Sequence, residues 1–249
     1  MKQITKPKSA AFLALLLGIA AAAARGLLYL LAVDEKGLLV HGHPLGLLLG
    51  VLSVAAVVPA CMQLSGKKAS GKLEDNFASG MAGAAGCAAM AAGIALTLLE
   101  GNDLLRSNLV LLWNVSGILA CLGLLWAALS RAKGKKSFLL VPALVCLFLG
   151  LHMVSRYQSW SGEPQAMDWV FSLLGAVGLT LCAYQLAAFS ADAGHRRSFL
   201  AEGGLTVFFC CAALPHTDYF WLYLGGLVWV LTTLWEMTAP VPVQPREEG

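Results

Sequence analysis

Charged residues are scarce in this chain. Asp, Glu, Lys and Arg make up 12% of its 249 residues, about half the share of an ordinary soluble domain. Hydrophobic residues make up 58%, and the mean hydropathy is +0.73. A domain in water cannot hide so much apolar surface, whereas a lipid bilayer accommodates it. The charges lie in short clusters between long apolar runs, which excludes a soluble enzyme or a soluble binding domain.

The polar segments between the apolar runs contain no cysteine. Cysteine buried in a membrane protein generally acts as a small packing residue. We therefore expect every cysteine to pack against neighbouring helices, and no disulfide framework. The seven residues concerned are Cys61, Cys87, Cys121, Cys146, Cys182, Cys210 and Cys211.

The familiar catalytic motifs are also missing. The sequence contains no HExxH, GxSxG or CxxC, so it predicts no zinc protease, serine hydrolase or dithiol site. Gly66–Leu73 resembles a phosphate-binding loop, but Leu73 replaces the magnesium-binding hydroxyl and no strand precedes it. We interpret this segment as a basic loop that contacts anionic lipid. The net charge of +3 is spread over several loops, which argues against a nucleic-acid partner. The sequence thus predicts no cofactor, no metal and no catalytic residue.

What the chain does have is a series of apolar runs, each at least 16 residues long. Because a spanning segment must satisfy its backbone hydrogen bonds internally, we predict an all-α bundle of eight transmembrane helices. The spans are expected at residues 10–33, 45–64, 80–99, 109–129, 138–154, 170–189, 199–214 and 220–235. Pro44 is placed to start the second helix and His43 to cap it. Residues 1–237 form one transmembrane domain, and the proline-rich residues 238–249 are predicted to be a disordered cytoplasmic tail.

The first run has a second interpretation. Basic residues followed by an apolar stretch and Ala22–Ala24 resemble a cleavable signal peptide, which would leave Arg25 as the mature N-terminus. The apolar run resumes directly after Arg25. Its total length suits a full span and exceeds that of a signal peptide's apolar region. These features favour an uncleaved first helix.

Orientation follows from the distribution of Lys and Arg among the short loops. The two termini and the even-numbered connections hold thirteen basic residues, and the odd-numbered connections hold three. We therefore predict that both termini are cytoplasmic, and that the chain resides in a bacterial cytoplasmic membrane. The three basic residues on the outer side are Lys36, Arg106 and Arg156.

Small residues are concentrated in the third run, which includes Gly80, Gly83, Gly86 and Gly93. Residues Ala20–Ala24 of the first run are similar. Small residues let neighbouring helix backbones approach closely, so we expect these two helices at the centre of the bundle and the leucine-rich fourth run facing lipid. The same residues could serve a homo-oligomer or a membrane-protein partner.

Arg25 is a charge within a predicted span, which costs roughly 2.5–3.5 kcal/mol at a helix centre. It precedes Asp34 by nine residues, so it lies about 13 Å below the outer flank of its helix. Two interpretations are open. Arg25 faces the bundle interior, where Ser53 and Asn114 at comparable depth could offer acceptors, or it extends towards the outer surface beside Tyr29.

The segment Leu151–Trp169 concentrates polar groups between two apolar runs, and we predict that it is one of the longest loops, on the outer side. His152 and Arg156 are four residues apart, so they share a helical face and are expected to point to the mouth of the bundle. Glu163 or Asp168 is the expected partner of Arg156. Trp160 and Trp169 are predicted to lie at the level of the lipid headgroups.

A metal site on the outer side is a further alternative, because imidazole and carboxylate groups together can bind a transition metal. Their spacing matches no diagnostic ligand pattern, which favours separate interfacial residues without a shared site. The histidines concerned are His41, His43, His152 and His216.

Three functions remain open from the sequence. The leading hypothesis is a small transporter-like or ligand-binding membrane protein with an outward-opening polar pocket lined by Arg25, Ser53, Asn114, His152 and Arg156. The second is an accessory subunit whose small-residue helices dock another membrane protein. The third is a membrane enzyme that acts on lipid at the outer leaflet. In each case the lipid bilayer is the constant partner.

Overall fold

The computed structural model describes residues 7–33, 39, 42–64, 77–100, 108–133, 140–162, 166–191 and 193–237. Within these residues the chain forms eight α-helices and no strand, which confirms the all-α prediction. The helices are α1 (Pro7–Leu31), α2 (Pro44–Leu64), α3 (Phe77–Glu100), α4 (Asn108–Ala132), α5 (Leu140–Gly162), α6 (Ala166–Ser190), α7 (Arg196–Ala213) and α8 (Phe220–Trp235).

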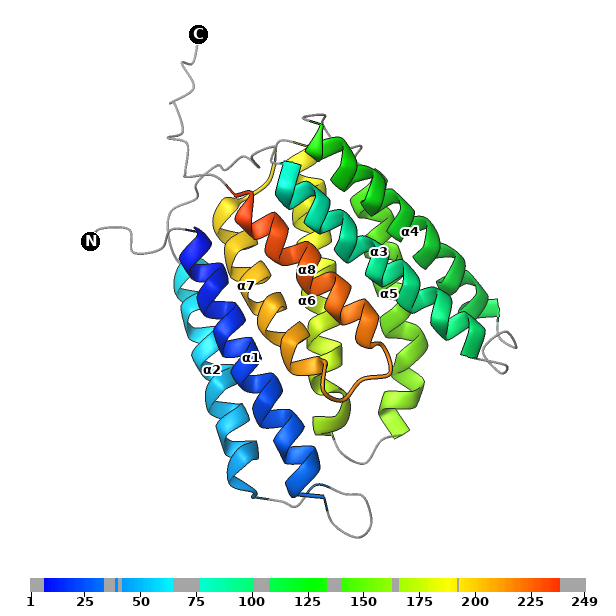
Figure 1. Cartoon of the computed structure of the whole chain (residues 1–249). Coiled ribbons are helices and arrows are strands. Elements are labelled where there is room, and N and C mark those ends of the chain that lie inside the picture. Colours follow the sequence, from blue (N-terminus) through cyan, green and yellow to red (C-terminus); the bar gives the residue numbers. More distant parts are fainter. Residues whose placement is uncertain are drawn as a thin grey trace, which may run out of the picture.

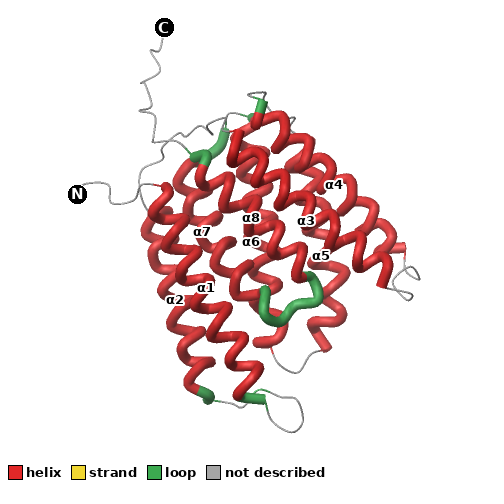
Figure 2. The backbone as a smooth tube through the Cα atoms, viewed as in Figure 1, coloured by secondary structure: helices red, strands yellow, loops and turns green. Residues whose placement is uncertain are grey.

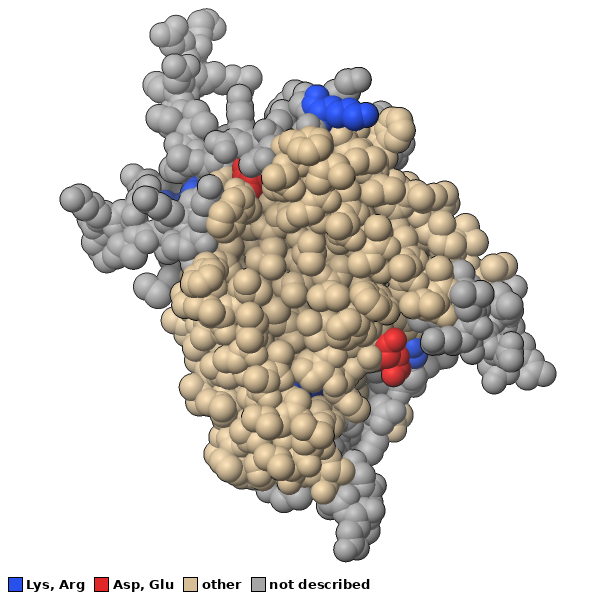
Figure 3. Space-filling model, viewed as in Figure 1, with Lys and Arg blue, Asp and Glu red and all other residues tan. Residues whose placement is uncertain are grey.

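Five helices are long and apolar enough to cross a membrane: α1, α2, α3, α4 and α6. Helices α5 and α8 carry shorter apolar segments. Figure 3 shows a broad uncharged surface over the middle of the bundle, with the charged side chains of this face near its ends. A lipid-facing surface has this distribution, because charged side chains belong at the membrane boundaries. The chain is therefore an integral, multi-pass membrane protein.

The last two helices occupy the middle of the molecule (Figure 1). Helices α1 and α2 flank them on one side, α3 and α4 on the other, and α5 and α6 lie behind. Twelve of the 18 residues of α7 and nine of the 16 of α8 are buried. In the apolar span of α1 only 33% of the residues are buried. The expectation that α1 is central is therefore wrong, whereas half of the α3 span is buried and α3 packs closely against α8. The small residues of both helices lie on the faces that pack against the α7–α8 hairpin.

The contact between α3 and α8 depends on glycine. The two helices run antiparallel, with Gly86 opposite Gly225 and Gly93 opposite Trp221. A Cβ atom on Gly86 would lie 2.7 Å from the carbonyl oxygen of Gly225, closer than van der Waals contact allows. The small residues of the third run thus serve packing within the chain, with α8 as the partner.

The ends of α2 agree with prediction, whereas the end of α5 does not. Pro44 is the first residue of α2, and the Leu45 N–H donates to His43 Nδ1 at 3.3 Å, so His43 caps this helix. Helix α5 continues to Gly162 and α6 begins at Ala166, so most of the predicted loop Leu151–Trp169 is helical. The apolar run ends earlier, but a polar sequence without glycine or proline continues a helix until Gly162 and Pro164 end it.

The seven cysteines are all free thiols. Five of them are buried and Cys146 is half-buried, as expected for packing residues. Cys61, near the end of α2, is exposed, so the packing prediction is wrong for this residue. Its helix has little protein around it: only 11% of the α2 span is buried.

The bundle has two ends. The terminal end is where α1 begins and α8 ends, and the distal end is where α1 ends and α8 begins. The turn between α7 and α8 lies at the distal end, where Figure 2 shows it as a loop over the bundle. It links the two antiparallel helices through residues 214–219.

The α3–α8 contact predicts a strong position dependence of glycine replacement. We expect Gly225→Ala to lower the free energy of unfolding by about 1–3 kcal/mol, because the added methyl group meets the backbone of α3. Gly50→Ala is the matched control, since a Cβ atom there meets nothing within 4 Å. Gly50→Ala should therefore stabilise the protein slightly, because alanine inside a helix is more stable than glycine by roughly 0.5–1 kcal/mol. Thermal unfolding in detergent, followed by tryptophan fluorescence, compares the two, and equal stability would contradict the packing described.

Candidate functional site

Arg25 faces the interior of the bundle, with a relative exposure of 1%. Its Nη1 donates to the carbonyl oxygen of Ala212 at 2.8 Å and to that of Ala213 at 3.3 Å. The guanidinium carbon lies 5.5 Å from the ring centroid of Tyr29 and 5.2 Å from that of Phe171. Arg25 thus joins α1 to the C-terminus of α7 and to α6, which decides between the two interpretations in favour of the interior one.

The position of Arg25 has a clear electrostatic basis. The last four carbonyl groups of a helix lack intrahelical donors, and this end of the helix carries a partial negative charge. A cation in a partly buried position there gains up to ~2 kcal/mol from the dipole, and each hydrogen bond to a charged group contributes ~1.5–3 kcal/mol. These gains are comparable to the cost of placing an arginine in a membrane span. Arg25 is therefore a structural cap of α7.

The acceptors expected for Arg25 were the wrong ones. Ser53 is half-buried on α2, and its hydroxyl donates to the carbonyl of Leu49 within the same helix at 2.8 Å. Asn114 is buried on α4, which packs against α3 and α5. Its Oδ1 accepts no hydrogen bond from the described residues. Backbone carbonyls of α7 take the place that the sequence assigned to these side chains, and Arg25 lines neither of the hollows that the structure describes.

A second polar group lies at the distal end, which we name the distal cluster: Trp113, His152, Arg156, Asp218 and Tyr219. His152 is fully buried on α5. Its ring stacks on Trp113 of α4 at a centroid distance of 5.5 Å, and the Tyr219 ring meets it edge-on at 4.8 Å. Trp113 and Tyr219 also contact each other edge-on at 5.7 Å. Three aromatic groups from α4, α5 and the α7–α8 turn therefore form the floor of the cluster.

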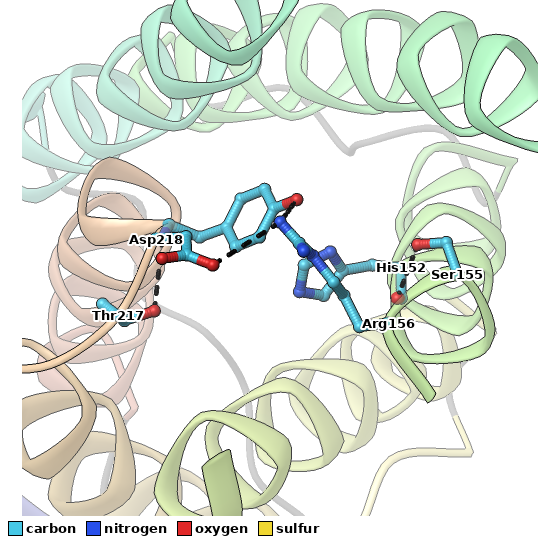
Figure 4. Close-up of polar contacts among 6 residues, drawn as sticks. His152, Ser155, Arg156, Thr217 and Asp218 are labelled. Carbon is cyan, nitrogen blue, oxygen red and sulfur yellow. Dashed lines mark hydrogen bonds and ion pairs between the residues drawn. The ribbon is translucent and has the colours of Figure 1, made fainter. Parts of the chain in front are cut away.

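Arg156 lies above this floor, one helical turn beyond His152 on the same face of α5. Figure 4 shows both side chains extending from α5 towards Asp218. The guanidinium carbon is 4.2 Å from the Tyr219 ring centroid, and Nη2 donates to the Tyr219 hydroxyl. Nη2 also lies 3.9 Å from the Asp218 carboxylate. The side chain of Arg156 is 22% exposed and that of Asp218 is 85% exposed, so this ion pair is open to solvent.

Tyr219 stays in its neutral form in this setting. Burial raises the pKa of its phenol, and the nearby Arg156 only partly offsets that effect. A neutral phenol offers its oxygen to Arg156 without adding a second negative charge. The turn that presents Tyr219 is held locally, because the Tyr219 N–H donates to the Thr217 hydroxyl at 3.2 Å.

His152 and Arg156 share one face of α5, as their spacing predicted, and Glu163 or Asp168 as a partner of Arg156 stays a prediction. Glu163 lies outside the described residues, as does the side chain of Asp168. The partners that the structure shows are Asp218 and Tyr219. The short polar turn between the last two apolar runs was the sequence feature that could have indicated Asp218 and Tyr219. This turn and the C-terminus of α5 lie at the same end of the bundle. Trp169 is half-buried, and the Trp160 side chain is not among those described.

The histidines have separate surroundings. His216 stacks on Tyr29 with centroids 4.0 Å apart, His43 caps α2, and His152 belongs to the distal cluster. His41 lies outside the described residues. Across the part of the chain that the structure describes, no three His, Cys, Asp or Glu side chains gather closely enough to hold a metal ion. The metal alternative therefore finds no support in the described residues.

The chain matches no protein-family model, no curated protein and no solved structure. Function is therefore inferred from the side chains themselves. Among those described, the Arg25 side chain is buried and bonded to the backbone of α7, whereas the Arg156 side chain is 22% exposed and pairs with the exposed Asp218.

The cap on α7 makes Arg25 sensitive to replacement. Arg25→Leu leaves two buried carbonyl groups without this donor, which we expect to cost about 1–3 kcal/mol of unfolding free energy. Arg25→Lys should be less harmful, because an ammonium group can still donate but lacks the planar surface that lies beside Tyr29 and Phe171. Thermal unfolding in detergent measures both. Leu27→Ala is the control, since Leu27 is 46% exposed on the same helix. Wild-type stability of Arg25→Leu would refute the cap.

Proposed function

We propose that the chain is an eight-span membrane protein, with both termini in the cytoplasm, that binds a small anionic ligand from the outside through Arg156. The proposal retains the ligand-binding hypothesis, but it locates the ligand at the distal cluster and not at Arg25. The observation that carries the proposal is the partly exposed side chain of Arg156, whose guanidinium lies over Tyr219 and next to the exposed carboxylate of Asp218.

The eight-span arrangement has two supports. Helices α5 and α8 carry apolar segments, Val141–Tyr157 and Phe220–Trp235, in addition to the five longer helices. The central α7 is shielded by neighbours on several sides, so it tolerates three charged residues near its start. With eight spans, the excess of thirteen basic residues over three places the terminal end in the cytoplasm.

Reporter fusions test this threading. Fusions after Lys72, Lys136 and Arg197 should give the signal of a cytoplasmic reporter, because their segments carry the basic residues that stay inside. Fusions at Lys36 and Gly162 should give the signal of an external reporter. A cytoplasmic signal at Gly162 would place the distal cluster on the other side and overturn the orientation.

A partly exposed arginine at the outer end suits an anion. The planar guanidinium can donate two parallel hydrogen bonds to a carboxylate or a phosphate. Its stacking on Tyr219 fixes its orientation while leaving part of it accessible. An incoming anion would replace Asp218, and this exchange costs little because an exposed ion pair is worth only about 0–1 kcal/mol.

The buried floor gives the site its rigidity. His152 is enclosed by Trp113 and Tyr219, so the residues beneath Arg156 are fixed by packing across α4, α5 and the α7–α8 turn. A ligand therefore meets a preformed cation, which reduces the entropic cost of binding.

The test is anion-dependent stabilisation of the purified protein. Inorganic phosphate and acetate, compared with chloride at equal ionic strength, should raise the unfolding temperature of the wild type, because a ligand that binds the native state stabilises it. Arg156→Gln should abolish this increase. Asp218→Asn should strengthen binding by up to about fivefold, since it removes the competing carboxylate.

Lys133→Gln is the matched control, because it removes an exposed positive charge at the opposite end of the bundle and should leave anion stabilisation unchanged. If Arg156→Gln is stabilised as much as the wild type, or if Asp218→Asn weakens binding, the proposed site is wrong.

A further inference from the structure

An apolar groove of about 380 Å³ lies in the terminal half of the bundle, between α1, α2 and α7. Phe12, Leu13 and Leu16 form its α1 wall, with Leu200 and Leu205 on α7. Most of the other residues that line the groove are small, which leaves space between the three helices. Its other lining residues include Ala55, Ala56, Pro59, Ala60, Ala201 and Gly204.

The groove lies at the depth of lipid acyl chains. Its α1 residues begin five positions after the first residue of that helix, which corresponds to about 7–8 Å along the axis. One leaflet contributes about half of a hydrocarbon core ~30 Å thick. A straight apolar chain that enters from the terminal side would therefore run along the groove, and lipid is the only apolar molecule that surrounds a membrane span throughout.

A positive charge stands at the terminal end of the groove. Arg197, in the first turn of α7, precedes Leu200, Ala201 and Gly204 by three, four and seven residues, so it shares their helical face. Side chains on a helix tilt towards its N-terminus, which directs Arg197 away from the apolar lining and towards the membrane surface. Arg197 is half-exposed and forms no ion pair with any described residue.

The start of α7 adds backbone donors at the same place. Its N-cap residue, His195, makes no side-chain hydrogen bond to the helix. The first N–H groups of a helix have no intrahelical acceptor, and together with the dipole they favour an anion such as phosphate.

We propose that this groove binds one anionic phospholipid from the leaflet at the terminal end. An acyl chain lies along Phe12, Leu16 and Gly204, and the headgroup phosphate meets Arg197 and the N-terminus of α7. The site is separate from the distal cluster and independent of any ligand bound there.

The experiment is native mass spectrometry of the full chain after removal of bound lipid. Phosphatidylglycerol and phosphatidylcholine with identical acyl chains are added separately. We expect the wild type to retain one phosphatidylglycerol with a preference of about fivefold over phosphatidylcholine, as one surface arginine supplies. Arg197→Gln should reduce the preference to about one, and Arg197→Lys should restore most of it. Lys133→Gln, which removes an exposed charge at the same end, should leave it unchanged.

A second variant tests the groove itself. Gly204→Leu should prevent retention of both lipids, because the leucine side chain fills the hollow. Gly50→Leu is the matched control on an open face of α2, where a Cβ atom meets nothing within 4 Å. Should Gly204→Leu fail to fold, the Arg197 variants still decide.

Three results would overturn the proposal. The first is equal retention of the two lipids by the wild type, and the second is an unchanged preference in Arg197→Gln. The third is a lipid-free dimer that Gly204→Leu converts to monomer, which would identify a second copy of the chain as the occupant of the groove.

Discussion

The guanidinium of Arg25 at the C-terminus of α7 is the interaction on which the arrangement of this bundle most depends. In hydrocarbon there is no water to satisfy the last carbonyl groups of a helix, and α7 ends in the buried residues Ala212 and Ala213. Arg25 supplies donors to both of them. A buried cation without acceptors and buried carbonyl groups without donors would each cost free energy. This single contact removes both costs. The contact also fixes the height of α1 relative to α7.

The α7–α8 hairpin gains its central position from close backbone contact on one side and this charge contact on the other. Gly86 and Gly225 bring α3 and α8 together, while Arg25 joins α1 to α7. Helices at the two ends of the sequence are therefore neighbours in space. The bundle is complete only when the last hairpin is in place, since α1–α2 and α3–α4 reach each other mainly through it.

Much of the fold could be predicted from the sequence, because apolar length and helix-start signals are local. The bounds of α8 and the cap of α2 by His43 are examples. The partner of Arg25 could not be predicted, because every residue has a backbone carbonyl and the sequence does not indicate which one lies next to Arg25. The extension of α5 was missed because its end was predicted from the end of the apolar run. An apolar run indicates which residues contact lipid, whereas the helix itself can continue into polar residues until a residue such as Pro164 interrupts it. Asp218 and Tyr219 reach Arg156 only through the tertiary fold.

The short turn after α7 has a consequence for communication across the distal end. Within residues 212–219 the chain holds Arg25 through two carbonyl groups, stacks His216 on Tyr29, and presents Asp218 and Tyr219 to Arg156. Two cations from distant parts of the sequence are thus fastened to one stretch of eight residues. A change in the conformation of this stretch would therefore alter the contacts of both arginines at once. The turn thereby links the buried contact of Arg25 to the partly exposed contact of Arg156 at the distal end.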